Sequence, residues 1–191
     1  MAQLTGKTII ITGSSRGVGA DTAQILAAEG ANIVVNYRSK APRANKIVKA
    51  IEEAGGKAVA VQADVTKAED LQTLVNTAVE TFGSLDYLIL NASGGMETGM
   101  GEDYAMRLNR DAQLNLARLA AEKMPEGGRI VFVTSHQAHF IREVETMDEY
   151  QPVAESKRAG EDALIAEIPA LSAVHWALLL PCFHVPLSTA L

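Results

Sequence analysis

Cysteine is almost absent from this chain of 191 residues, in which Cys182 is the single example. One thiol excludes a disulfide within the chain, and a protein that needs no disulfide fits a reducing compartment. The segment from Met1 to Gly6 lacks the charged start and the separate cleavage region of a secretory signal peptide. We therefore expect a cytoplasmic protein.

Basic residues are in the minority, with 17 Lys and Arg against 23 Asp and Glu and a net charge of −6. Because nucleic acids and anionic membranes attract basic surfaces, we expect neither as the main partner. Long apolar runs are missing too, since the most apolar stretch, Trp176 to Phe183, is short and contains a proline. We expect no membrane span and no bound metal.

Aromatic residues make up only 5% of the chain, although 48% of its residues are hydrophobic. Ala, Val, Leu and Ile dominate, which favours buried parallel strands covered by Ala-rich helices over a β-sandwich. The length fits one domain with a sizeable core, so we expect residues 1–191 to form a single domain.

Strand-like and helix-like segments alternate along the chain. The strands are expected at Thr8–Ile11, Ala31–Asn36, Lys57–Gln62, Asp86–Leu90, Arg129–Thr134 and Ala173–Leu180. The helices are expected at Val18–Glu29, Ala41–Ala54, Lys67–Thr81, Glu102–Lys123 and Val153–Glu167. This alternation predicts a Rossmann-like, doubly wound parallel sheet in a three-layer α/β/α fold. The one long connection, Ser135–Gln151, is expected to be an active-site loop.

A glycine-rich turn, Thr12–Gly19, separates the first strand from the first helix. Gly13 permits a sharp turn, Gly17 lets the backbone approach a pyrophosphate, and Gly19 lets helix and strand pack closely. The helix N-terminus then faces the phosphates with its free N–H groups. Three glycines can also make nothing more than a tight turn, but the strand–turn–helix context favours a dinucleotide site.

The end of the second strand reads Asn36-Tyr37-Arg38-Ser39 and has no carboxylate for the ribose 2′-hydroxyl of NAD. Arg38, together with Arg16 from the glycine turn, is suited to a 2′-phosphate instead. The alternative is that Arg38, Lys40, Arg43 and Lys46 are only a solvated helix start. The sequence favours NADP over NAD.

Together these motifs resemble the short-chain dehydrogenase/reductase family, over residues 5 to about 168. Thr12–Gly19 matches its TGxxxGxG turn, Asp64-Val65 its adenine-contacting pair, and Asn91-Ala92-Ser93-Gly94 its NNAG motif. Asn109 stands where the family has a helix-borne asparagine. Arg129–Ser135 resembles the strand that ends in the catalytic serine, and Ser156-Lys157 the serine–lysine pair of the next helix.

The resemblance implies an NADP-dependent oxidoreductase that acts on a small carbonyl or secondary alcohol and assembles as a dimer or tetramer. In the family a tyrosine is the general acid or base, serine orients the substrate oxygen, lysine holds the nicotinamide ribose and asparagine a relay water. The implied catalytic residues are Ser135, Tyr150, Lys157 and Asn109. The implied cofactor-binding residues are Gly13, Ser15, Arg16, Gly17, Val18, Gly19, Tyr37, Arg38, Ser39, Asp64, Val65, Asn91, Ala92, Ser93, Gly94 and Lys157.

The tyrosine departs from the family pattern, Tyr-x-x-x-Lys. Val153 stands four residues before Lys157, and Tyr150 stands seven before it, where a continuous helix would carry it about 10 Å along the axis. Pro152 favours a helix start after Tyr150, which would let Tyr150 fold back toward Ser135. The alternative is a packing or surface tyrosine.

Other assignments stay open as well. Asn115 is an alternative to Asn109, Lys157 fits a solvated helix lysine, and His136 and His139 are alternative acids next to Ser135. The segment 171–191 is atypical for the family, because Cys182 follows Pro181 where a glycine is usual and the chain looks shortened. Two rival functions follow: a dinucleotide-binding protein with impaired catalysis, and an interaction protein whose apolar tail docks a partner.

Overall fold

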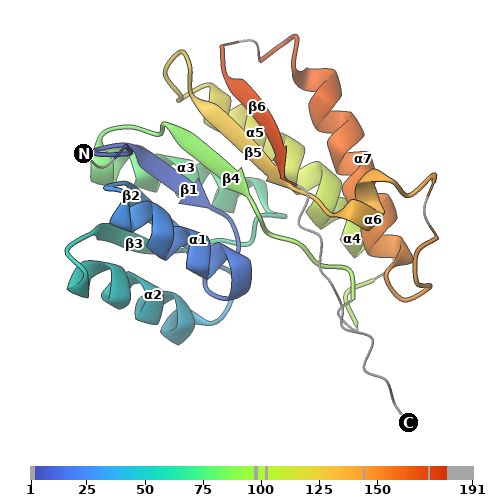
Figure 1. The fold of residues 1–191 in the computed structure, drawn as a ribbon, viewed down its shortest axis with the longest axis horizontal. Coiled ribbons are helices and arrows are strands. Elements are labelled where there is room, and N and C mark those ends of the chain that lie inside the picture. The colour runs from blue at the N-terminus through green and yellow to red at the C-terminus, as the bar shows by residue number, and fades with distance from the viewer. Residues whose placement is uncertain (1–2, 97–98, 102, 144, 172, 180–191) are drawn as a thin grey trace.

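A computed structural model describes residues 3–96, 99–101, 103–143, 145–171 and 173–179. Six parallel strands form one sheet in the order β3-β2-β1-β4-β5-β6 (Figure 1). They are β1 Thr8–Ile11, β2 Asn32–Tyr37, β3 Lys57–Gln62, β4 Tyr87–Leu90, β5 Arg129–Val133 and β6 His175–Leu179. The predicted Rossmann-like parallel sheet is confirmed, and each strand starts within two residues of its predicted start.

Helices connect the strands and cover the sheet. They are α1 Gly17–Ala28, α2 Ala41–Glu53, α3 Ala68–Phe82, α4 Tyr104–Met106, η1 Arg107–Asp111, α5 Ala112–Ala121, α6 His136–His139 and α7 Gln151–Glu167. α1 packs beside α2 on one face of the sheet, and α3, α5 and α7 pack in a row on the other (Figure 1). The described residues contain no helix whose length and apolar character would suit a membrane crossing.

The core sits around the central strand β1. Its Ile9, Ile10 and Ile11 are at most 1% exposed, because a strand covered by helices on both faces buries every side chain.

The strand order changes direction at β1. On one side of it lies β2, the next strand in the chain, and on the other side lies β4, which comes only after β3. At such a switch point the connections leave in opposite directions and open a crevice beyond the carboxyl ends of the strands.

Two segments differ from their predicted form. The single helix expected over Glu102–Lys123 contains a π-helical turn, η1, between α4 and α5, while Glu102 itself lies outside the described residues. The expected loop Ser135–Gln151 contains the helical turn α6, and α7 begins at Gln151, two residues before the predicted Val153. Pro152 sits in the first turn of α7, where its missing N–H costs no hydrogen bond.

The π-helical turn packs closely against α7. A Cβ atom built on Gly160 of α7 would lie 2.3 Å from the Asn109 carbonyl oxygen of η1. Only glycine allows this approach, which brings the buried Asn109 next to the start of α7. Residues of the last predicted strand and tail, from Leu180 through Pro181 and Cys182 to Leu191, lie outside the described residues.

We expect Gly160→Ala to destabilise the protein, although alanine has the higher helix propensity. The overlap with the Asn109 carbonyl outweighs the propensity gain, so the free energy of unfolding should fall by about 1–2 kcal/mol. Urea unfolding measures the change, with the exposed Ala166→Ser on the same helix as a near-neutral control. A Gly160→Ala variant as stable as the wild type would contradict the close packing.

Candidate functional site

The glycine turn between β1 and α1 has the backbone that the sequence predicted. Gly13 and Gly17 have φ values of 65° and 55°, in the left-handed region that favours glycine. A Cβ on Gly19 would lie 2.6 Å from the Asn91 amide nitrogen and 2.9 Å from the Ser14 Cα. The turn therefore brings the N-terminus of α1 and its free N–H groups to the mouth of the crevice.

Two asparagines hold this turn from either side. Asn36, at the end of β2, accepts the Gly13 N–H at 3.0 Å and donates to the Ala63 carbonyl at 3.0 Å. Asn91, after β4, donates to the Thr12 carbonyl at 2.8 Å. The turn is thus fixed to the ends of three strands, which keeps its open amides in place before any ligand arrives.

A cavity of about 540 Å³ opens beside the turn, at the carboxyl ends of β1, β2, β3 and β4. The predicted residues that line it are Gly13, Ser15, Arg16, Gly17, Val18, Gly19, Tyr37, Arg38, Ser39, Asp64, Val65, Asn91, Ala92 and Ser93. Six further lining residues were not predicted: Asn36, Lys40, Arg43, Ala63, Tyr104 and Leu108. Gly94 and Lys157, both predicted to bind cofactor, do not line this cavity.

The charges in this cavity are mostly positive. Arg16, Arg38, Lys40 and Arg43 all line it, and Asp64 is the only carboxylate among the lining residues. The Asp64 carboxylate already accepts the Thr66 hydroxyl at 2.7 Å and the Thr66 N–H at 3.1 Å. The cavity therefore suits an anionic ligand, and three of these cations, Arg38, Lys40 and Arg43, follow β2 in the chain.

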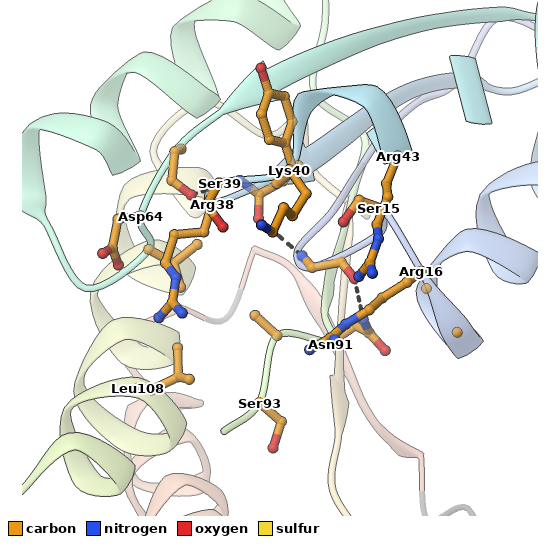
Figure 2. A pocket seen from close by; sticks show the side chains of 18 of the residues that line it. Ser15, Arg16, Arg38, Ser39, Lys40, Arg43, Asp64, Asn91, Ser93 and Leu108 are labelled. Atoms are coloured by element: carbon orange, nitrogen blue, oxygen red, sulfur yellow. Dashed lines mark hydrogen bonds between the residues drawn. The ribbon is translucent and has the colours of Figure 1, made fainter. Parts of the chain in front are cut away.

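Arg38 does not point to the same place as the other cations. Its guanidinium reaches across to α4, where it donates to the Tyr104 hydroxyl at 2.5 Å and lies 5.9 Å from the centre of the Tyr104 ring. Figure 2 shows Arg38 near Asp64 and Leu108, while Arg16 and Arg43 lie toward the glycine turn. No local pattern points to Tyr104, because this contact joins residues 66 positions apart.

A second cavity, of about 320 Å³, adjoins the first through the shared residue Ser93. Gly94, Met96, Tyr150 and Val153 complete its lining. The Tyr150 hydroxyl donates to the Ser135 hydroxyl at 3.1 Å. Tyr150 is the residue just before α7, and its side chain folds back toward Ser135, as predicted.

Ser135 itself is nearly fully buried at the end of β5 and caps α6, where its hydroxyl accepts the Ala138 N–H at 3.2 Å. Val153, at the family's tyrosine position, is buried and faces Gly95: a Cβ on Gly95 would lie 3.1 Å from a Val153 methyl group. Tyr150 therefore reaches the serine from one helical turn before the usual position.

Asn109 and Lys157 are both buried beside these residues. Asn109 donates to the Gly94 carbonyl at 2.7 Å and to the Ser156 hydroxyl at 2.9 Å, whereas Asn115 is exposed. Lys157 donates to the Val133 carbonyl at 2.9 Å. Within the described residues its ammonium makes no hydrogen bond to Tyr150. Burial lowers the pKa of Lys157 to about 8.

The two histidines next to Ser135 have other partners. His139 Nδ1 lies 2.8 Å from the Glu161 carboxylate, and its ring packs edge-on against Phe140. His136 also packs on the Phe140 ring. In the described part of the chain, no three His, Cys, Asp or Glu side chains gather as a metal site would require.

Known proteins match this sequence and fold. The short chain dehydrogenase family matches residues 7–150. An uncharacterized oxidoreductase of Methylorubrum extorquens is 42% identical over 142 residues, which are 71% of this chain and 57% of that protein. The chain thus spans little more than half the length of this relative.

Solved structures agree in fold along nearly the whole chain. The reductase LugOII, described as catalysing a keto-reduction, has a TM-score of 0.84 and 30% identity and covers 95% of this chain and 84% of its own. A short chain dehydrogenase from Burkholderia cenocepacia in complex with NADP has a TM-score of 0.81 and 31% identity. The match covers 94% of this chain and 75% of that one. The match over residues 7–150, with its glycine turn and strand order, means that this chain belongs to the short-chain dehydrogenase/reductase family of oxidoreductases.

Proposed function

We propose that the chain is an NADP(H)-dependent oxidoreductase that transfers a hydride between the nicotinamide and a small carbonyl or secondary alcohol. The observation that carries this proposal is the Tyr150–Ser135 hydroxyl pair, 3.1 Å apart, beside a cavity that adjoins the cationic one. The first cavity would hold the dinucleotide and the second the substrate. The keto-reduction described for LugOII and the NADP bound to the Burkholderia protein agree with it.

The residues of the first cavity fit NADP. The left-handed Gly13 and Gly17 and the close approach at Gly19 leave room for a diphosphate against the N-terminus of α1. Four cationic side chains and no acid at the end of β2 suit a 2′-phosphate better than a bare 2′-hydroxyl. Tyr104 holds Arg38 on one side of the cavity, and Arg16 and Arg43 approach from the other side, so these arginines would receive the phosphate of the adenosine end.

When bound, the nicotinamide supplies the hydride chemistry. The chain's own residues would handle the substrate oxygen. Ser135 would orient that oxygen, and Tyr150, already bonded to Ser135, would give or take its proton. The buried ammonium of Lys157 would hold the nicotinamide ribose. Asn109 would secure the Gly94 backbone against α7.

A second candidate function is dinucleotide binding with impaired catalysis. Val153 at the usual tyrosine position favours it, as does Lys157, which bonds the Val133 carbonyl and not Tyr150. Binding and catalysis are separable: NADPH that raises the melting temperature without turnover of any ketone or aldehyde would support the binder. We also propose that residues 1–191 act as one domain and that copies associate as a dimer or tetramer.

NADPH should bind more tightly than NADH, and Arg38 should account for much of the difference. Removing a charge-assisted contact to a phosphate in Arg38→Ala should weaken NADPH binding about 10-fold to 100-fold and change NADH binding less than about threefold. Calorimetric titration of both nucleotides measures this. Lys46→Ala, exposed on the nearby helix α2 and outside the cavity, is the matched control. Equal dissociation constants for the two nucleotides in the wild type would contradict the NADP assignment.

Tyr150→Phe should abolish turnover and leave NADPH binding intact. Loss of a general acid or base typically lowers the rate by about 100-fold to 10,000-fold. The measurement is NADPH oxidation over a panel of ketones and aldehydes, followed by calorimetry on the same sample. Tyr87→Phe, on β4 and outside both cavities, is the control. A variant that keeps wild-type rates would leave Tyr150 as a packing residue.

A further inference from the structure

Glu161 is a carboxylate of α7 with no exposure to solvent, 0% of its surface. A buried carboxylate is stable only where donors satisfy it. Its partners come from three places: the Thr134 hydroxyl just after β5 donates to it, His139 Nδ1 of α6 lies 2.8 Å away, and the Arg158 guanidinium of α7 forms an ion pair at 3.6 Å. Glu161 lines neither cavity.

Two of these partners flank Ser135. Thr134 precedes it directly, and His139 ends the helical turn that Ser135 caps, with the His139 N–H donating to the Ser135 carbonyl at 2.9 Å. One carboxylate therefore fixes both ends of the segment 134–139, and the serine hydroxyl that receives Tyr150 lies between them. A shift at either end would move that hydroxyl.

The same carboxylate lies one helical turn beyond Lys157. Its negative charge raises the pKa of Lys157 and so opposes the larger lowering effect of burial. The other faces of Lys157 meet the Val133 carbonyl and, at 5.9 Å, the Phe132 ring. The remaining titratable or charged groups around the pair are His139 of α6, Arg158 and Asp162 of α7, and Tyr150 at the start of α7.

We propose that Glu161 is a positioning residue of this site: it anchors the segment that presents Ser135 and supplies the negative charge next to Lys157. The inference rests on the proposed function, since both of its targets act there. Glu161 touches neither cavity, so it acts through Thr134, His139 and Lys157. Without its charge Lys157 would lose its proton at a lower pH, and the ammonium that would hold the ribose would be neutral over more of the working range.

Glu161→Gln separates this role from plain packing, because the amide keeps the volume and removes the charge. The Lys157 titration is followed by NMR of ¹³C-labelled lysines, with Lys157→Met assigning the signal, and kcat is followed against pH. We expect the Lys157 midpoint to fall by at least about half a pH unit, and kcat at pH values above that midpoint to fall by about threefold or more. The alkaline limb of the kcat profile should move to lower pH by the same amount.

Thr134→Val tests the anchor without touching the charge. It should lower kcat by about fivefold or more and leave the Lys157 midpoint in place. Glu155→Gln makes the same chemical change at an exposed position of α7 and should alter neither quantity. A carboxylate with only a structural role would lower the melting temperature of Glu161→Gln with no movement of the Lys157 midpoint.

The proposal is overturned if folded Glu161→Gln keeps either the wild-type kcat profile or the wild-type Lys157 midpoint. Should Glu161→Gln not fold, Thr134→Val decides, and an unchanged kcat in that variant overturns the proposal. A wild type without turnover refutes the proposed function alone, because the NMR midpoint still reports the effect of Glu161 on Lys157.

Discussion

The bend between β1 and α1 is the constraint on which the rest of the site depends. Its backbone follows a path open to glycine at Gly13 and Gly17. Asn36 accepts the Gly13 N–H and Asn91 donates to the Thr12 carbonyl, so the neighbouring strands hold the start of the bend in place. Parallel strands deliver those two asparagines to the same edge, one on each side of β1. The anion-binding surface is thus made by the sheet as a whole, and a change in strand register would dismantle it.

The region around Ser135 is held in a comparable way, by buried hydrogen bonds between polar groups. Ser135 leaves β5 and caps α6, Lys157 reaches back from α7 to the Val133 carbonyl, and Asn109 joins Gly94 to Ser156. The bonds of Lys157 and Asn109 link elements that are far apart in the chain, since Lys157 and Val133 are 24 positions apart and Asn109 and Ser156 are 47 positions apart. Because buried polar groups are costly when unpaired, these links favour one arrangement of β4, β5 and α7 over its neighbours. A site built in this way is rigid before ligand arrives, which lowers the cost of orienting a substrate.

Local patterns were enough to predict the sheet and most of the residues that line the first cavity. Alternating apolar runs located every strand, and the glycine spacing located the turn, since both signals lie within a few neighbouring residues. Tyr104, Asn36 and Glu161 were missed for one reason: their roles come from partners 22 to 66 positions away, such as Arg38 for Tyr104 and His139 for Glu161. The π-helical turn was also missed, because it reflects packing against Gly160, which no pattern within residues 102–123 encodes.

Tyr150 lies next to Ser135 although a valine stands at the usual motif position. A valine at position 153 removes the hydroxyl from the helix face above Lys157, and helix geometry alone would put Tyr150 too far along the axis. Tyr150 stands just outside the helix, so its hydroxyl is not bound to follow the helical face and reaches Ser135. The Lys157 ammonium bonds the Val133 carbonyl of β5 and, among the described residues, makes no hydrogen bond to Tyr150. Acid–base chemistry from this arrangement would depend more on the serine than on the lysine, which is why the anchoring of Ser135 by Glu161 matters to it.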